Sequence, residues 1–411
     1  MKTRVVVVGG GASGLVAALT AARAGAAVVL FEKGRTLGRK ILASGGGRCN
    51  LGNARLDASH YHGGDRGFVR AVLSRFGNAE SRALFEGLGL MLVQEADGRV
   101  FPRTGQARSV LAVLEAGLNR SGVHVQTGRE VTAVRAGGRG FAVETSGGGR
   151  HEADRVILAC GGASYPQLGG GDHGVRLAES LGLAAAPRTP CLVPLVSKDH
   201  WVRKLAGVRV EAALCAQLEG RQIAASRGEL LFTPYGVSGP AALDLSREVV
   251  QALDGGEVEC SANLFSDLSR KEVDELFLER FASISPLSPA ALLRGAVPEA
   301  VAEVFLAGQA KEIPLHESPS EDAVLCLARG LGRWTFSVCG HRPWEEAMAS
   351  AGGVRLAEVA PETLEARGRK GLHVTGELLD VDGDSGGYNL HFAWATGSLA
   401  GAAAAGLKLL D

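Results

Sequence analysis

The sequence predicts an α/β fold: a Rossmann-like domain assembled from both ends of the chain, with a β-rich subdomain and a small helical subdomain inserted between them. Three observations predict it. A β-branched run leads into a glycine-rich turn near the N-terminus. A strand, a glycine pair and an apolar helix end the chain, and the intervening residues change from strand-like to charged, helix-like patterns.

The composition is that of a folded globular protein with two to three domains. The chain has 411 residues, of which 46% are apolar and 21% charged, and this excludes bulk disorder. Lysine plus arginine (44) equals aspartate plus glutamate (44) and no basic block occurs, so we expect no nucleic-acid partner. No apolar window reaches about 20 residues, so we expect no membrane partner.

The cysteines and glycines carry further information. Seven cysteines are scattered without a C-x-x-C pair, which favours a reducing compartment, and we expect a cytoplasmic protein. The first 26 residues also fit a signal peptide, but three glycines interrupt the stretch where a signal core is most helical. Glycine is in excess, at 58 residues, which indicates loops that approach a ligand or another backbone closely.

A dinucleotide fingerprint lies close to the N-terminus. Residues 5–8 predict a strand buried on both faces, and Gly9, Gly11 and Gly14 follow it as G-x-G-x-x-G. The first glycine permits a tight turn, the second lets a pyrophosphate approach the backbone, and the third lets helix and strand pack closely. The alanine-rich helix that follows directs its first amides at the anion.

A second strand completes this unit. Gly25 ends the helix, and residues 27–31 predict a strand that delivers Glu32 at its tip. A carboxylate there accepts the hydroxyls of an adenosine ribose and repels a 2′-phosphate, which disfavours NADP at this site. Lys33 beside it is interpreted as a solvated surface cation, the alternative being a selector for phosphate.

The same pattern recurs once, at Gly169, Gly171 and Gly174. It precedes a helix predicted at residues 175–181, but Pro166 and a glycine pair separate it from the preceding strand. We interpret it as a glycine-rich loop, with a second nucleotide site as the alternative.

Two further segments favour FAD over NAD. Residues 44–48 place three glycines beside cationic positions, which suits a backbone wrapped round a cofactor; the alternative is a flexible surface loop. Near the C-terminus, a strand at 371–375 is followed by acids, a glycine pair and a helix at 390–407. An acid such as Glu377 or Asp380 would accept from ribityl hydroxyls, and the helix start would stabilise a reduced ring. The alternative is a turn before a core helix.

Four ordered blocks resemble a known family. They are GGGASGLVAALTAARAGAAVVLFEKGRTLGRKILASGGGRCNLGN, CGGASYPQLGGGDHG, RGELLFTPYGVSGPAALDLS and AGGVRLAEVAPETLEARGRKGLHVTGELLDVDGDSGGYNLHFAWATGSLAG. Together they resemble the bacterial BaiN-like and aminoacetone-oxidase-like FAD-dependent oxidoreductases. Pro234 stands where many members carry histidine, and His391 where glutamine is common.

The resemblance implies FAD as cofactor, with NAD(P)H as a candidate transient electron donor. We expect the FAD to be non-covalent, because none of the four blocks contains a characteristic histidyl or cysteinyl attachment site. It implies that the fingerprint holds the pyrophosphate, Glu32 the ribose, and Val131 the adenine through its backbone. The expected cofactor-binding residues are Gly9, Gly11, Ala12, Ser13, Gly14, Glu32, Lys33, Arg39, Lys40, Ser44, Gly45, Gly46, Gly47, Arg48, Val131, Gly376, Glu377, Asp380, Gly386, Gly387, Tyr388 and Asn389.

The expected function is an FAD-dependent oxidoreductase that transfers hydride between the flavin and an unidentified small molecule. No Ser-His-Asp pattern, metal-spaced His/Cys cluster or H-E-x-x-H motif occurs, so we assign no catalytic side chain and no metal. The alternatives are an NAD-dependent dehydrogenase and a non-catalytic flavin- or nucleotide-binding sensor. Cys49 is interpreted as a packed thiol, and Tyr388 and His391 as packing residues, with proton transfer as their alternative role.

Since both ends serve one cofactor, the chain must leave the first domain and return. We expect an FAD-binding domain at residues 1–190 and 350–411, a β-rich subdomain at 191–265 and 333–349, and a helical subdomain at 266–332. Within the excursion, Ser238 and Pro240 open a helix, where the serine is either a simple cap or part of a site for an anionic substrate group.

Overall fold

The computed structural model describes residues 2–138, 140–283, 288–309 and 319–407. The chain divides into two compact units, of which the first comprises Met1–Pro190 and Met348–Asp411 and the second Cys191–Ala347. Both ends of the chain therefore belong to the same unit.

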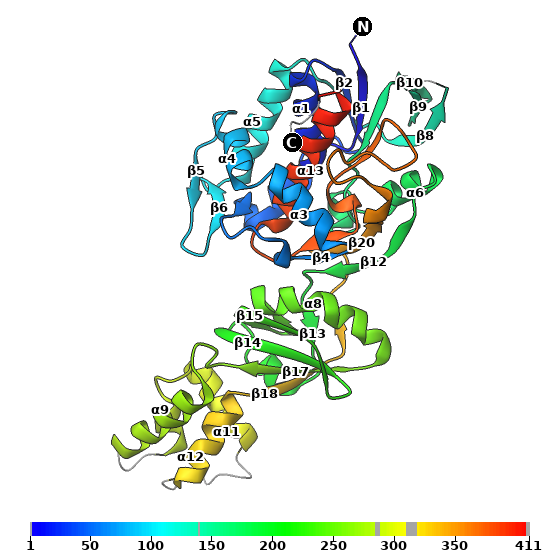
Figure 1. Cartoon of the computed structure of the whole chain (residues 1–411). Helices are drawn as coiled ribbons and strands as arrows, with labels where there is room; N and C mark the ends of the chain where they lie inside the picture. The colour runs from blue at the N-terminus through cyan, green and yellow to red at the C-terminus, as the bar shows by residue number, and fades with distance from the viewer. Residues whose placement is uncertain (1, 139, 284–287, 310–318, 408–411) are drawn as a thin grey trace. The chain divides into compact units, whose positions relative to one another are not determined.

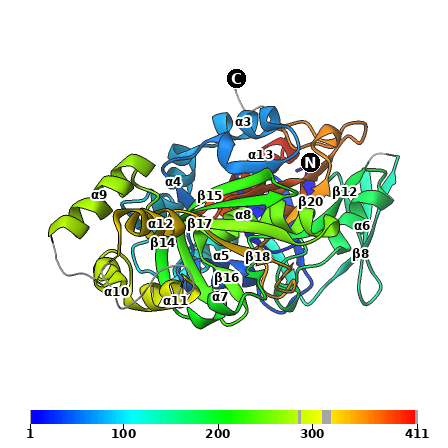
Figure 2. The same ribbon diagram turned by 90° about the horizontal axis from the view of Figure 1, so that it is seen from below.

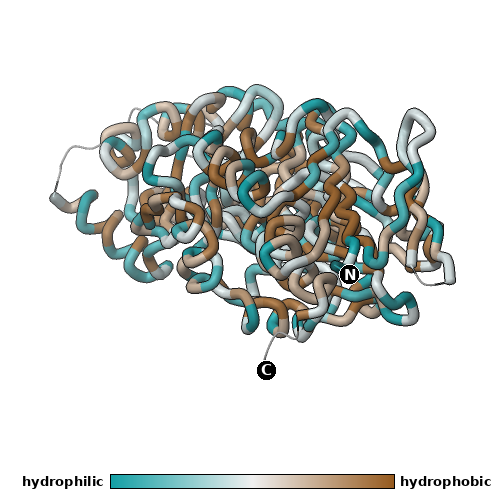
Figure 3. The backbone as a smooth tube through the Cα atoms, turned by 90° about the horizontal axis from the view of Figure 1, so that it is seen from above, coloured by the Kyte–Doolittle hydropathy of each residue, from teal (hydrophilic) through white to brown (hydrophobic). Residues whose placement is uncertain are grey.

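A five-stranded parallel sheet forms the centre of the first unit (Figure 1). Its order is β21-β11-β1-β2-β7, and every neighbouring pair is parallel. Val6 and Val7 of β1 are buried, as expected for a strand covered on both faces, and the tube is apolar there beside the N-terminus (Figure 3). The strands are β1 Arg4–Val8, β2 Ala27–Glu32, β7 His124–Thr127, β11 Arg155–Leu158 and β21 Leu372–Val374.

Helices α1 (Ala12–Arg23) and α13 (Tyr388–Ala404) pack side by side (Figure 1). A Cβ on Gly397 would lie 2.3 Å from the Ser13 carbonyl oxygen, and one on Gly401 would lie 2.4 Å from that of Ala17. These glycines thus permit backbone contact between the two ends of the chain. The last helix begins two residues before the start expected at 390 and ends at Ala404 instead of 407.

Other helices and small sheets complete this unit. The helices are α2 Arg39–Ala43, α3 Arg66–Arg75, α4 Asn78–Glu86, α5 Ala107–Arg120 and α6 His173–Ser180. The small sheets pair β3 Gly52–Asn53, β6 Arg99–Pro102 and β5 Leu92–Gln94; β8 Val131–Gly137, β9 Gly140–Thr145 and β10 Gly149–Ala153; β4 Tyr61–Gly63 and β22 Val381–Gly383; and β12 Ala185–Cys191 and β20 Ala349–Val354. Helix α6 starts at His173, two residues before the expected start at 175.

The second unit is built on a seven-stranded antiparallel sheet of order β18-β17-β14-β15-β16-β13-β19, against which α8 packs (Figure 2). Its strands are β13 Leu195–Val196, β14 Arg209–Leu218, β15 Arg221–Thr233, β16 Gly236–Ser238, β17 Val258–Asn263, β18 Trp334–Val338 and β19 Gly340–His341. Its helices are α7 His200–Lys204, α8 Pro240–Ala252, α9 Arg270–Ser283, α10 Pro289–Leu293, α11 Glu299–Gln309 and α12 Glu321–Leu331.

The sheet and the helices of this unit share one apolar core, to which Phe232, Phe277 and Leu327 all contribute. Parts of the expected helical subdomain, 284–287 and 310–318, lie outside the described residues. Of the two alternatives for Ser238, the simple cap is wrong: Ser238 ends strand β16, and Gly239 takes the cap position of α8 without a side-chain hydrogen bond.

Candidate cofactor site

The glycine fingerprint forms a tight turn between β1 and α1. Gly9 has φ of +110°, and its N–H donates to the Phe31 carbonyl oxygen at 2.8 Å. A Cβ on Gly14 would lie 1.9 Å from the Gly9 carbonyl oxygen, so only glycine lets the helix start this close to the strand. Gly11 caps α1 without a side-chain hydrogen bond, and a Cβ there would meet no atom within 4 Å. The first turn thus presents backbone amides to an open space, as an anion site requires.

Glu32 lies beside this turn. Its Oε2 accepts from the Gly10 N–H and its Oε1 from the Gly34 N–H, each at 2.7 Å. Because each carboxylate oxygen has two lone pairs, the side chain is fixed in place and retains acceptor capacity for ribose hydroxyls. Lys33 is exposed, which agrees with its interpretation as a surface cation.

The loop that follows α2 reaches the start of α13. Gly45 and Gly46 have left-handed φ values of +56° and +64°. Asn50 is buried, and its Oδ1 has no hydrogen-bond partner among the described residues. A Cβ on Gly387, at the cap of α13, would lie 2.7 Å from this oxygen. An unpaired buried acceptor therefore faces an uncapped helix start, where the first and last sequence blocks meet.

The turn before α13 is held by side chains. Asn389 Oδ1 accepts from the Gly383 N–H at 2.9 Å, and its Nδ2 donates to the Gly383 carbonyl oxygen at 2.7 Å. Asn53 Nδ2 donates to the Gly386 carbonyl oxygen at 3.2 Å. Tyr388 is buried, and its carbonyl oxygen accepts from Tyr61 Oη at 3.1 Å. Asn389 and Tyr388, both expected to contact cofactor, thus have structural partners here.

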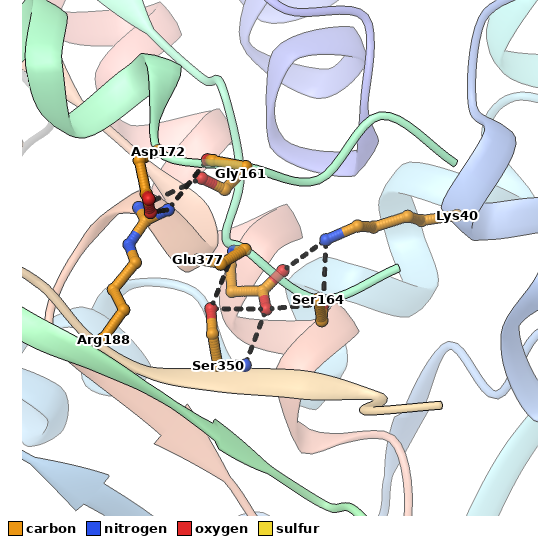
Figure 4. A network of polar contacts seen from close by, with 9 residues as sticks. Lys40, Gly161, Ser164, Asp172, Arg188, Ser350 and Glu377 are labelled. Carbon is orange, nitrogen blue, oxygen red and sulfur yellow. Dashed lines mark hydrogen bonds and ion pairs between the residues drawn. The ribbon is translucent and has the colours of Figure 1, made fainter. Parts of the chain in front are cut away.

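Lys40 and Glu377, predicted as separate cofactor contacts, bind one another (Figure 4). Lys40 Nζ lies 3.2 Å from Glu377 Oε2 and also donates to Ser164 Oγ at 2.9 Å. Glu377 Oε1 accepts from Ser164 Oγ at 3.1 Å, and from the Ser350 N–H at 2.9 Å and Oγ at 3.1 Å. Burial acts to raise the pKa of Glu377, but Lys40 and the serine hydroxyls outweigh it and lower that pKa below its usual value. The carboxylate is therefore ionised at neutral pH.

Arg188 adds a second cation to this region and was not foreseen from the sequence (Figure 4). Its side chain is only 5% exposed, and it donates to the carbonyl oxygens of Gly161 at 3.3 Å and Gly171 at 3.0 Å. Burial lowers its pKa. Arg188 thereby ties together the two ends of the loop that carries Ser164. It lies in the proline-containing strand β12, and no local sequence signal pairs it with either glycine.

The remaining predicted residues divide between the site and its surroundings. Gly376 lies against the start of α1, since a Cβ on it would lie 2.6 Å from Ser13 Oγ. Asp380 follows that turn and is half-buried. Arg39 donates to the Gln167 carbonyl oxygen. Arg48 instead pairs with Glu95 at 2.6 Å and lies 3.9 Å from the centre of the Phe101 ring.

Val131 and Cys49 have surroundings within the protein that bear on their expected roles. The Val131 carbonyl oxygen, expected at the adenine, accepts from His173 Nε2 at 2.7 Å. Cys49 is fully buried with φ of +60°, and burial raises the pKa of its thiol to about 12. This confirms its interpretation as a packed thiol.

The second glycine pattern lacks the geometry of a nucleotide fingerprint. Residues Pro166–Leu168 form a 3₁₀ turn that ends at Gly169, so no strand leads directly into the glycines. The segment is the loop between β11 and α6, in agreement with the loop interpretation.

His391 is fully buried on α13. Its Nε2 lies 3.1 Å from the Phe76 carbonyl oxygen, and burial lowers its pKa from 6.5 to about 4. The ring is therefore neutral at pH 7, and its interpretation as a packing residue agrees with this burial.

Acid should destabilise the protein through His391. Because its pKa is lower in the folded state, the unfolded chain binds more protons between about pH 6.5 and pH 4, and stability falls as pH falls through that window. One such group contributes a slope of up to about 1.4 kcal/mol per pH unit. His391→Gln should reduce the slope measured by denaturant unfolding at several pH values. An unchanged slope would contradict this, whereas a residual slope is expected from His373, whose pKa burial also lowers.

Within the described ranges, no group of three or more His, Cys, Asp or Glu side chains could hold a metal ion. Across the same residues, no helix has both the length and the apolar character needed to cross a membrane.

Comparison with known proteins gives a consistent result. A family model described as the HI0933-like protein Rossmann domain matches residues 3–403. The chain is 40% identical over 410 residues to a 3-dehydro-bile acid delta(4,6)-reductase of Clostridium scindens, covering 98% of this chain and 99% of the relative. It is 30% identical over 396 residues to a ribosomal RNA dihydrouridine synthase of Escherichia coli, covering 95% of each.

Among solved structures, the chain resembles a 3-ketosteroid delta1-dehydrogenase of Sterolibacterium denitrificans with a TM-score of 0.52 at 12% identity, covering 98% of this chain and 99% of that one. This likeness concerns the fold. The family match spans nearly the whole chain, and the relative with the higher of the two identities is named as a reductase. The chain therefore belongs to the HI0933-like Rossmann family of flavin-dependent oxidoreductases.

Proposed function

We propose that this protein binds FAD without a covalent bond in its first unit and reduces a carbon–carbon double bond conjugated to a carbonyl group in a small molecule, with NAD(P)H as electron donor. The observation that carries the proposal is the convergence of the two chain ends. Gly397 lies against Ser13 beside the open turn at Gly11, and Gly387 faces Asn50 Oδ1, which has no partner among the described residues.

These features fit FAD at two points. The amides at the start of α1 and the Glu32 carboxylate suit the pyrophosphate and ribose, and the Asn50 Oδ1 and the start of α13 suit the flavin end. Bound FAD would supply hydride chemistry. Around it, Lys40 and Glu377 would hold the Ser164 loop in place, and Arg188 would fix the ends of that loop.

The names of the relatives support the substrate class. One is a reductase of a 3-dehydro-bile acid with Δ4,6 unsaturation, and the other forms dihydrouridine in ribosomal RNA. In both cases the reduced bond is conjugated to a carbonyl group. The higher identity to the bile acid reductase, and the balance of 44 cationic and 44 anionic side chains, favour a small molecule over RNA.

The domain ranges expected from the sequence are kept as part of the proposal, with the FAD-binding domain at 1–190 and 350–411. The division of the chain between Pro190 and Cys191 supports them. The scatter of seven cysteines along the chain without a C-x-x-C pair supports a reducing, cytoplasmic location.

The proposal is tested with purified protein. We expect flavin absorbance bands, release of the flavin on acid precipitation, and anaerobic bleaching of the bands by NADH or NADPH. Adding a 3-oxo-4,6-diene steroid should restore the bands, whereas uridine and ribosomal RNA fragments should not. Colourless protein that does not take up FAD would refute the cofactor, and reoxidation by RNA alone would refute the small-molecule assignment.

Glu32→Ala should weaken FAD binding about 10- to 100-fold, because it removes the ribose acceptor and releases the Gly10 and Gly34 amides that the carboxylate fixes. The measurement is titration of apoprotein with FAD by fluorescence quenching. Arg35→Ala, at an exposed position three residues further along, is the matched control and should bind FAD like the wild type. Equal affinity in both variants would contradict the role of Glu32.

A further inference from the structure

Two histidines share one carboxylate just before α13. His60 Nδ1 lies 2.9 Å from Asp384 Oδ2, and His62 Nε2 lies 2.7 Å from Asp384 Oδ1. The two histidines flank Tyr61 at the start of β4, which pairs with β22 in antiparallel register, so residues distant in sequence meet at this point. Because imidazole titrates near neutral pH, two imidazoles on one carboxylate form an arrangement that can hold or move protons.

The cluster lies beside the proposed flavin end of the site. The His60 ring stacks on the Tyr388 ring, with centroids 4.3 Å apart and planes inclined by 16°. Tyr388 is the first residue of α13, directly after Gly387, whose cap position faces Asn50 Oδ1. The same turn is held by Asn53, which donates to the Gly386 carbonyl oxygen. His60 is thus attached to the turn that begins the helix.

The geometry leaves one ring nitrogen of His60 available. Asp384 is the one hydrogen-bond partner of the His60 ring among the described residues, and it engages Nδ1. A carboxylate at Nδ1 fixes the orientation of the ring and leaves Nε2 as the nitrogen that can exchange a proton. The His60 side chain is 35% exposed, so it can regain a proton from water.

The proposed reduction requires such a proton. Hydride adds to the β-carbon of the conjugated double bond, and the displaced π electrons move toward the carbonyl oxygen as an enolate. The α-carbon then gains a proton as the N–H bond of the donor breaks and its electron pair stays on nitrogen. The donor ends neutral and recovers its proton from water. The two electrons come from NAD(P)H through the cofactor.

We propose that His60 Nε2 donates this proton to the α-carbon of the substrate, and that Asp384 and His62 are positioning residues that hold the His60 ring. The proposal rests on the proposed function above. His60→Gln should slow reoxidation of the reduced enzyme by the enone at least about 100-fold, the effect expected for loss of a general acid. Reduction of the flavin by NAD(P)H should keep its wild-type rate, because that half-reaction does not use this proton.

The variants are first compared for FAD content and Tm, and Asp384→Asn, which preserves shape, provides a second test if His60→Gln does not fold. Asp384→Asn should also slow reoxidation, with a smaller effect than His60→Gln. His124→Gln, at an exposed position at the start of β7, is the matched control and should behave like the wild type. Wild-type reoxidation rates in His60→Gln and Asp384→Asn would overturn the proposal.

A readout independent of turnover is ¹⁵N NMR of histidine-labelled holoprotein, with the His60 signals assigned by their loss in His60→Gln. The 3-oxo steroid formed by one reduction of the 3-oxo-4,6-diene should shift the His60 Nε2 resonance and leave that of His124 unchanged. An unshifted His60 resonance would overturn the proposal. Wild-type protein that binds flavin and accepts electrons from NAD(P)H yet transfers none to any enone would instead refute the proposed substrate class, and the inference with it.

Discussion

Replacing Gly397 with alanine is expected to lower the free energy of unfolding by about 3 kcal/mol and to abolish tight FAD binding. The added methyl carbon would lie 2.3 Å from the Ser13 carbonyl oxygen, and backbone cannot rotate out of the way as a side chain can. Helix α13 must therefore move away from α1, which displaces the turn at Gly387 relative to the fingerprint. For a unit of this size the loss corresponds to a fall in Tm of about 6–12 °C.

The matched control is Gly308→Ala, in helix α11 of the second unit, where a Cβ would meet no atom of the described residues within 4 Å. There alanine should be neutral or stabilise the protein by about 0.5–1 kcal/mol, because glycine is unfavourable inside a helix. Chemical denaturation and FAD titration of both variants check the prediction. If Gly397→Ala were as stable as Gly308→Ala and bound FAD normally, the close contact of α1 with α13 would not be what holds the two chain ends together.

Replacing Glu377 with alanine should have the second large effect, a loss of about 2–4 kcal/mol. The carboxylate accepts from Lys40, Ser164 and Ser350, and its removal leaves the ammonium group of Lys40 without its ionic partner. Because Lys40 and Glu377 side chains are 29% and 21% exposed, water offsets part of this loss. Loss of the hydrogen bond to Glu377 should also release the loop that carries Ser164, and we expect FAD to bind more weakly as a result.

Glu144→Ala is the control for this pair, because Glu144 forms an ion pair with the well-exposed Arg135 and its loss should leave Tm nearly unchanged. A double-mutant cycle of Lys40→Met and Glu377→Gln isolates the interaction between the two side chains. We expect the two substitutions to be non-additive, and strictly additive effects on the free energy of unfolding would show that this ion pair does not stabilise the fold.

The sequence predicted the parts of the fold whose signals are local. The valine run of β1, the fingerprint glycines and Glu32 lie within one short segment whose spacing sets its structure, and the parallel sheet was foreseen from them. The apolar helix at the C-terminus was found for the same reason, although its start was placed after Tyr388 instead of at it. The start was misplaced because the residue at the cap position, Gly387, has no side chain that would mark the beginning of a helix.

Contacts between side chains that are far apart in the chain could not be predicted from the sequence. Lys40 and Glu377 were each expected near the cofactor, but nothing in the chain indicates that they bind one another across 337 positions. Arg188 stands two residues before the expected end of the segment 1–190, yet it donates to the carbonyl oxygen of Gly161. His60 and Asp384 are separated by 324 positions, and only the pairing of β4 with β22 brings them together.

The two ends of the chain are proposed to hold one FAD molecule between the start of α1 and the start of α13. An experimental structure of the FAD-loaded protein tests this placement most directly. We expect the pyrophosphate at the amides of residues 11–14 and the isoalloxazine ring against residues 386–389 and Asn50. FAD bound away from either helix start, or a saturating FAD complex in which Asn50 Oδ1 remains without a partner, would contradict it.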